Sequence, residues 1–173
     1  MRCYESVTAF FYFWHMAKIS KRTKWRFEKL ANSMEAYYHQ LDLRSWDEFD
    51  DEAFEFIMQK VKGVNMLDLN ELDISNASIA LLPRLEYVKE LRIKGCRMID
   101  NRAIPFIREI RQLEFLHAKG TGITIEGLLQ IGPSDKFKEI LFSAEEGIDI
   151  SEKMSALIKA MPFCKFVING TVY

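Results

Sequence analysis

Cysteine and histidine are scarce in this sequence. It holds three cysteines and three histidines in 173 residues. The cysteines, Cys3, Cys96 and Cys164, are odd in number and far apart, which excludes a paired zinc motif and a dense disulfide framework. The histidines are equally scattered. We therefore expect no metal, no cofactor and thiols that stay reduced.

Catalytic motifs and a membrane-spanning run are also missing. The sequence has no Gly-x-Ser-x-Gly and no His-Glu-x-x-His. The apolar run at residues 9–17 is shorter than the about 20 residues that cross a bilayer. Positive charges follow this run rather than precede it, unlike in a signal peptide. These absences favour a non-enzymatic chain without a spanning helix.

Charge is unevenly distributed, although the net charge is −1. Residues 1–27 hold six basic residues against Glu5 alone, a net of +5, so the remainder carries −6. We predict that residues 1–22 form an arm that binds a membrane surface or a partner. A packed helix with a solvated basic tail is the simpler alternative, and a nucleic-acid contact is a third, without a known reader motif. The interleaved aromatic and basic residues are Phe10, Phe11, Trp14, Lys18, Lys21, Arg22 and Lys24.

Five stretches of the chain fit one frame, Leu-x-x-Leu-x-Leu-x-x-Cys. The clearest of them starts at residue 88. Its marked positions are occupied by Val88, Leu91, Ile93 and Cys96. The starts are 24, 25, 24 and 26 residues apart, and they are Val64, Val88, Leu113, Phe137 and Phe163. A further isoleucine follows each of four strands by seven or eight residues, at Ile74, Ile99, Ile123 and Ile148.

This period is typical of a leucine-rich repeat, in which a strand, a turn and a helix form one unit. No unit can bury its apolar face alone, so neighbouring units stack into one core. The sequence therefore predicts an α/β fold: a short leucine-rich-repeat solenoid with parallel strands on one side and helices on the other. Residues 64–173 form this domain, with four repeats and a terminal strand.

Residues 23–63 do not show the frame and predict an α-helical amino-terminal cap. Apolar residues at helical spacing predict one amphipathic helix over residues 26–41 and a second over residues 54–61. An acidic stretch precedes the second helix, and Gly63 is predicted to end it. We expect the second helix to cover the open end of the repeats.

Two features that suggest chemistry are better explained by the repeat. The Lys-Gly-Thr-Gly segment at residues 119–122 lies between a strand and a helix, as phosphate loops do. It occupies the same turn as residues 94–97 one unit earlier, and no Gly-Lys-Ser/Thr follows. Cys96 lies at the inward position of its unit, so we interpret it as a buried structural thiol.

Strand alternation predicts which residues face away from the helices. The central row contains Asp68, Arg92, His117, Leu141 and Val167. The middle of this surface is basic around an exposed aromatic, and such a combination is common in interface hot spots. We predict a protein-binding site that consists of Glu90, Arg92, Lys94, Phe115, His117 and Lys119.

The stretch from residue 84 to residue 107, with Leu91, Cys96, Ile99 and Asp100, resembles the cysteine-containing leucine-rich repeats. It is most similar to the mitochondrial ATP synthase subunit s (coupling factor B) family, which includes an assembly component for the distal membrane arm of complex I. The aromatic residues near residue 11 are similar to that family's amino-terminal region. The family's Cys-x-Cys is here Lys94, Gly95 and Cys96.

The resemblance implies a non-catalytic accessory, coupling or assembly factor of a respiratory complex, on the matrix side of the mitochondrial inner membrane. We expect a monomer that binds a protein subunit, with peripheral membrane contact and without nucleic acid. One alternative is a cytosolic inhibitor or immunity-type binding protein with the same fold. A second alternative is an enzyme or redox sensor that uses Cys96.

Overall fold

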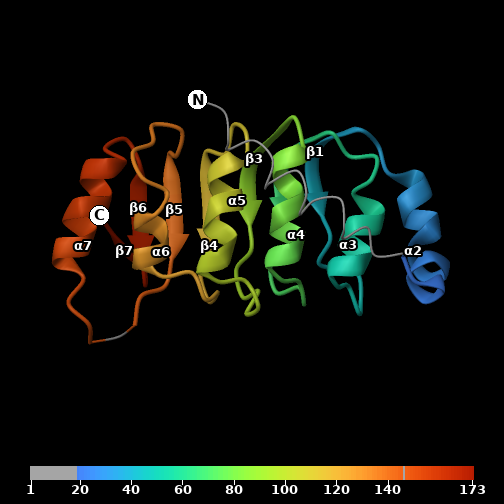
Figure 1. Cartoon of the computed structure of the whole chain (residues 1–173), viewed down its shortest axis with the longest axis horizontal. Helices are drawn as coiled ribbons and strands as arrows, with labels where there is room; N and C mark the ends of the chain where they lie inside the picture. The colour runs from blue at the N-terminus through green and yellow to red at the C-terminus, as the bar shows by residue number, and fades with distance from the viewer. Residues whose placement is uncertain (1–18, 146) are drawn as a thin grey trace, which may run out of the picture.

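The computed structural model describes residues 19–145 and 147–173. The described chain is α/β, with one open, mostly parallel sheet whose strand order follows the chain, β1 to β7 (Figure 1). The first six strands are parallel, and β7 pairs antiparallel with β6. The strands are β1 (Tyr37–Asp42), β2 (Gly63–Asp68), β3 (Tyr87–Arg92), β4 (Phe115–Ala118), β5 (Glu139–Phe142), β6 (Lys165–Ile168) and β7 (Thr171–Val172).

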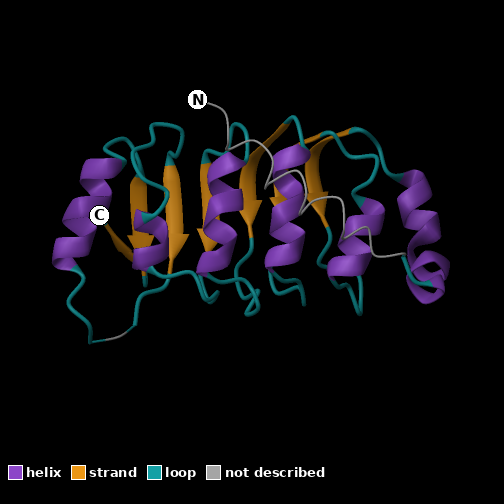
Figure 2. Ribbon diagram, in the orientation of Figure 1, coloured by secondary structure: helices purple, strands orange, loops and turns teal. Residues whose placement is uncertain are grey.

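The helices lie on one side of this sheet and form a row in front of the strands (Figure 2). We call the side of the sheet beneath them the covered face and the opposite side the open face. The helices are α2 (Lys21–Ser33), α3 (Asp51–Ile57), α4 (Asn76–Leu81), α5 (Ile104–Glu109), α6 (Ile125–Leu129) and α7 (Ser151–Ala160), with short 3₁₀ turns η1 (Leu82–Arg84) and η2 (Asn101–Ala103).

One row of apolar residues runs across the covered face from strand to strand. Its members are Cα partners in the register of the parallel strands, and all five are fully buried. Burying such a side chain stabilises a fold by about 1.5–3 kcal/mol. The predicted inward phase of the strands is therefore confirmed for Leu67, Leu91, Leu116, Ile140 and Phe166.

A second set of contacts joins the helix starts to one another. Asp51, the first residue of α3, accepts hydrogen bonds from the amide and hydroxyl of Ser75, at 2.9 and 2.6 Å, and from the amide and hydroxyl of Ser78. Asn76, which begins α4, accepts from the Asp100 amide at 3.1 Å. These links satisfy polar groups that a helix amino terminus leaves open.

The same kind of hydrogen bond joins the next pair of helix starts, and, among the described residues, the helix starts after it lack one. Asn101 accepts from the Thr124 amide at 2.9 Å, and its own amide donates to the Thr124 hydroxyl at 3.1 Å. Ile125 begins α6 and has no polar group with which to form the next link. At the following helix start, Ile150 provides no side-chain cap to α7. The repeated isoleucine position changes here as well, because Ile148 is 51% exposed whereas Ile74, Ile99 and Ile123 are buried.

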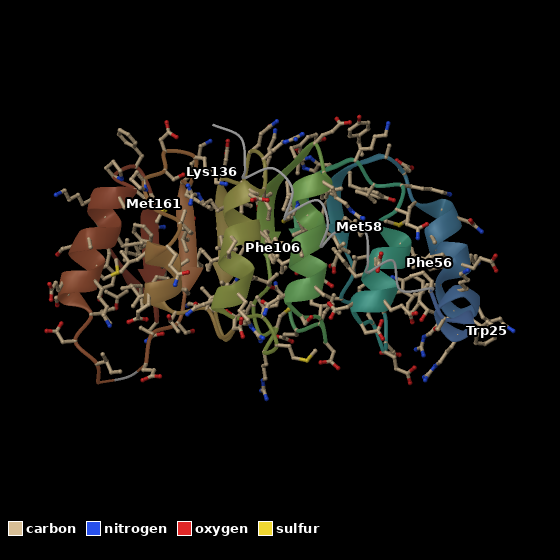
Figure 3. The ribbon with its side chains drawn as sticks, in the orientation of Figure 1. Trp25, Phe56, Met58, Phe106, Lys136 and Met161 are labelled. Atoms are coloured by element: carbon tan, nitrogen blue, oxygen red, sulfur yellow. The ribbon has the colours of Figure 1, made fainter. Side chains whose placement is uncertain are left out.

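The carboxyl end of α5 is satisfied by the side chain of Lys136. The Nζ atom of Lys136 donates to the backbone carbonyls of Arg108 at 2.7 Å and Ile110 at 3.0 Å, at the end of α5 (Figure 3). The ammonium group also lies 4.9 Å from the centre of the Phe137 ring. A cation in this place complements the negative end of the helix dipole.

The amino-terminal part differs from the prediction in two ways. The helix predicted over residues 26–41 ends at Ser33, and Tyr37–Asp42 is strand β1. Leu41 of β1 is the Cα partner of the inward Leu67, and Leu43, directly after the strand, is also buried. The second difference is that α3, the helix predicted to cover the end of the repeats, is not the last in the row of helices. Helix α2 lies beyond it (Figure 1).

Gly63 was predicted to end a helix, but it begins β2. A Cβ atom there would lie 2.5 Å from the ring of Tyr87, so the glycine makes room for the neighbouring aromatic side chain. That ring stacks at 6.4 Å on Tyr37 across the glycine. Phe163, which the frame predicts to be inward, is 78% exposed, because it precedes β6, the last parallel strand, beyond the last helix α7.

Candidate functional site

The six residues of the predicted binding site lie together on the open face. Glu90 and Arg92 belong to β3 and are the Cα partners of Phe115 and His117 on β4. Adjacent strands lie about 4.8 Å apart, so these side chains are direct neighbours. Lys94 and Lys119 follow in the turns after the two strands, and the Gly95 amide donates to the Lys119 carbonyl at 2.8 Å.

Arg92 and Phe115 form the centre of this cluster. The guanidinium carbon of Arg92 lies 5.5 Å from the centre of the Phe115 ring, a cation–π arrangement. Its Nη2 atom also donates to the Glu90 carboxylate at 3.1 Å. Phe115 is therefore half-buried rather than exposed, which corrects the prediction of an exposed aromatic. The covering group is an arginine that a partner could itself contact.

His117 lies among positive charges. Its Nε2 atom is buried and has no hydrogen-bond partner among the described atoms. Burial lowers the pKa of its imidazole, and the nearby charges of Lys119, Lys94 and Arg92 lower it further, while Asp68 acts in the opposite direction. The ring is therefore neutral at neutral pH.

The two lysines differ in their surroundings. Lys94 is exposed and lies 3.4 Å from the Glu71 carboxylate. Lys119 is half-buried and makes no ion pair with any residue that the structure describes. We call Arg92, Lys94, His117 and Lys119 the basic patch.

An acidic group borders the basic patch on the side of β1 and β2. Asp68 is 4% exposed, although strand alternation places it on the open face. It accepts from the Asn70 amide at 3.1 Å and lies 3.5 Å from Nε of Arg44. Arg44 in turn makes two bonds to Asp42, at 2.9 and 2.6 Å. This pair holds the pKa of the Asp42 carboxyl below its usual range.

Asp42 and Arg44 were not predicted to lie on the open face, because strand β1 was predicted to be part of a helix. A signal for the strand was present, since Tyr38, Leu41 and Leu43 fit the same Leu-x-x-Leu-x-Leu frame 26 residues before Val64. The two polar residues then take the open-face positions of that frame.

The predicted arm is only partly described. Phe10, Phe11, Trp14 and Lys18 lie outside the described residues. The remaining members, Lys21, Arg22 and Lys24, are exposed on α2, where Arg22 pairs with Glu48 at 2.6 Å. Trp25 is 84% exposed and points away from the body on the outer side of α2 (Figure 3).

Cys96 is fully buried, in agreement with the inward position that the frame gives it. Its thiol donates to the Leu69 carbonyl at 3.0 Å, and burial raises its pKa to about 11. Burial likewise raises the pKa of Cys164 to about 12. Since the thiolate is the nucleophilic form, neither thiol is reactive at neutral pH.

The glycine-containing turn after β4 makes contacts typical of a turn. Gly120 has a φ of +69°, a conformation that favours glycine, and lies against Gly95 of the preceding turn. The Thr121 hydroxyl donates to the Ala118 carbonyl at 2.8 Å and accepts from the Ile123 amide. These bonds close the turn upon itself.

Within residues 19–145 and 147–173, no three metal-ligating side chains come together. No helix in the same residues has the length and apolar character needed to cross a membrane. The sequence matches no known family model and no curated protein.

Proposed function

We propose that the chain is a leucine-rich-repeat solenoid that binds a protein partner through the open face of its sheet. The support for the repeat is the agreement between sequence spacing and sheet register. Residues 24 or 25 apart in the frame, such as Leu67, Leu91 and Leu116, are Cα partners on successive strands. A chain of this kind buries one side of every strand by stacking units.

The observation that carries the binding proposal is the asymmetry of the sheet. Among the described residues, helices cover one face, whereas six parallel strands present the other face without a helix above them (Figure 2). The open face combines a ring, an arginine and uncompensated positive charge, and aromatic residues and arginine are enriched where interfaces hold their binding energy. Extended open surfaces are the ones that repeat proteins use for partners.

The cellular setting that we propose follows from the resemblance of residues 84–107 to the ATP synthase subunit s family. It is a non-catalytic accessory or assembly role at a respiratory complex on the matrix side of the inner membrane. A cytosolic binding protein of inhibitor or immunity type keeps the same fold and the same binding face. Localisation of the tagged full chain by microscopy separates the two settings.

Affinity capture with two matched variants tests the binding face. Leu141→Arg places a charge at a half-buried position on β5 of the open face, and Ile158→Arg makes the same kind of change at an exposed position on α7. We expect proteins captured by the wild-type chain to be lost with Leu141→Arg and retained with Ile158→Arg. Loss with Ile158→Arg alone would place the binding face on the helices and contradict the proposal.

A further inference from the structure

Two buried nitrogen atoms on the open face lack hydrogen-bond partners. They are Nε of Arg92 and Nε2 of His117. In the described part of the chain, no other buried side-chain nitrogen or oxygen lacks a hydrogen-bond partner. Both residues belong to the basic patch and are Cα partners. A buried donor without an acceptor costs about 1–3 kcal/mol, so its presence in a surface cluster points to a ligand that supplies an acceptor.

The charges around these atoms show where an anion is attracted. Arg92 is compensated by Glu90 and Lys94 by Glu71. Lys119 has no such acid among the described residues, and it lies beside His117. The positive charge that remains for a partner is therefore centred on Lys119 and, once it is protonated, on His117.

We propose that the basic patch binds an aspartate or glutamate side chain from an acidic segment of the protein partner, between His117 and Lys119. Nε2 of His117 donates a hydrogen bond to one carboxylate oxygen, and the Lys119 ammonium group supplies the opposite charge. This inference rests on the proposed function and specifies the chemistry of the partner. The half-buried Leu141 on the adjacent strand β5 would contact apolar parts of the same segment.

A carboxylate fits this patch better than a phosphate group does. A phosphate carries up to two negative charges, and the patch is bordered by Asp68 and Glu90 as well as Glu71. These acids repel a doubly charged ligand more strongly than a singly charged one. A carboxylate also needs few donors, which agrees with one imidazole and one ammonium group.

Binding of an acid at this place should take up a proton. The charged groups that face His117 are Asp68 from β2, Arg92 from β3, and Lys94 and Lys119 from the turns, while its partner on β5 is the uncharged Leu141. The positive groups and burial keep the imidazole neutral in the unbound chain. A bound carboxylate favours the charged imidazolium, so affinity should increase as the pH falls below neutrality.

Fluorescence anisotropy with a labelled deca-aspartate peptide tests the inference on the full chain. We expect the wild-type affinity to rise at least threefold from pH 8 to pH 6, where aspartate stays ionised. His117→Gln should bind more weakly at pH 6 and lose the pH dependence. Lys119→Gln should bind more weakly at both pH values, whereas Lys159→Gln, the same charge change on α7, should behave as the wild type.

Nuclear magnetic resonance of the histidine side chains gives a second readout. The signals absent from His117→Gln identify His117, and its pKa should rise when the peptide is added. Absence of peptide binding, an unchanged His117 pKa, or equal competition by inorganic phosphate and by free peptide would each overturn the acidic-partner inference. If Leu141→Arg still abolishes capture of partner proteins while the peptide does not bind, only this inference fails and the proposed function stands.

Discussion

The two faces of the sheet share one backbone but follow different rules. On the covered face the row that contains Leu67, Leu91 and Leu116 is fully buried and apolar from β2 to β6. On the open face the adjacent row changes character along the sheet, from acidic Asp68 through basic Arg92 and His117 to apolar side chains on β5 and β6. Packing fixes the first row, whereas the second row is free to take the chemistry that a partner requires. Stability and binding should therefore be separable by face.

The largest effect should come from truncating the covered face. Leu91→Ala and Leu116→Ala each leave a cavity in a fully buried row, so we expect each to lower the free energy of unfolding by about 2–5 kcal/mol. Leu141→Ala is the matched control, because it removes the same atoms from a half-buried position on the open face. Urea denaturation should show a loss of less than about 1.5 kcal/mol for the control. Equal losses for all three variants would show that the faces are not different.

A smaller loss should follow from breaking a link between helix starts. Asp51→Ala removes four hydrogen bonds and leaves the buried hydroxyl of Ser78 without its acceptor. We expect a loss of about 1–3 kcal/mol in the same denaturation experiment. Asp73→Ala is the control, because Asp73 is exposed and makes no hydrogen bond with the described residues, and it should change the stability little. An unchanged urea midpoint for Asp51→Ala would show that these hydrogen bonds between helix starts do not stabilise the fold.

The open-face centre should affect binding more than stability. The double variant Phe115→Ala with Arg92→Ala removes a cation–π contact and a partly exposed ion pair, which together contribute about 1 kcal/mol. We expect binding to a captured partner to fall more than about tenfold, or about 1.4 kcal/mol. Phe163→Ala with Arg97→Ala changes the same residue types at exposed positions outside the binding site and should bind normally. A double variant that unfolds, or that binds at full strength, would contradict the assignment of Phe115 and Arg92.

The smallest effect at neutral pH concerns Cys96 on the covered side. Its folded pKa of about 11 exceeds that of an unfolded thiol, which is about 8.5. The stability that the thiol contributes is therefore present below about pH 8.5 and is lost as the pH rises towards 11. We expect the wild type to lose stability over this range more steeply than Cys96→Ala. Alkylation by iodoacetamide should be slow in the folded chain and fast in urea, and fast native labelling would instead support a reactive thiol.

The inward rows could be predicted from the sequence because a parallel stack repeats its chemistry at a fixed interval. The frame placed Val88, Leu91, Ile93 and Cys96 inward, and all four are fully buried. It also indicated which side chains share the open face, including Arg92 and His117. What it could not supply was the contact of Arg92 with Phe115 and Glu90, because that depends on side-chain conformation rather than on spacing.

Strand β1 shows how two periods can compete. Tyr37, Tyr38 and Leu41 continue the helical spacing of the residues before them, so the period of 3.6 extended the predicted helix too far. The strand frame was equally present and pairing with β2 decided the outcome. The links between helix starts also had a signal, since Asp51, Asn76 and Asn101 are 25 residues apart. Phe163 was misplaced, and Ile148 is exposed unlike the earlier isoleucines, because the regular interval ends near α6 and α7.

Photo-crosslinking from the two sides of the molecule tests the central claim most directly. A photoreactive p-benzoylphenylalanine would replace Leu141 or Val167 on the open face, or Ile158 on α7, in cells that produce the chain. We expect a specific protein to be crosslinked from Leu141 and Val167 and not from Ile158. A specific protein crosslinked from Ile158, with none from the two open-face positions, would contradict this claim.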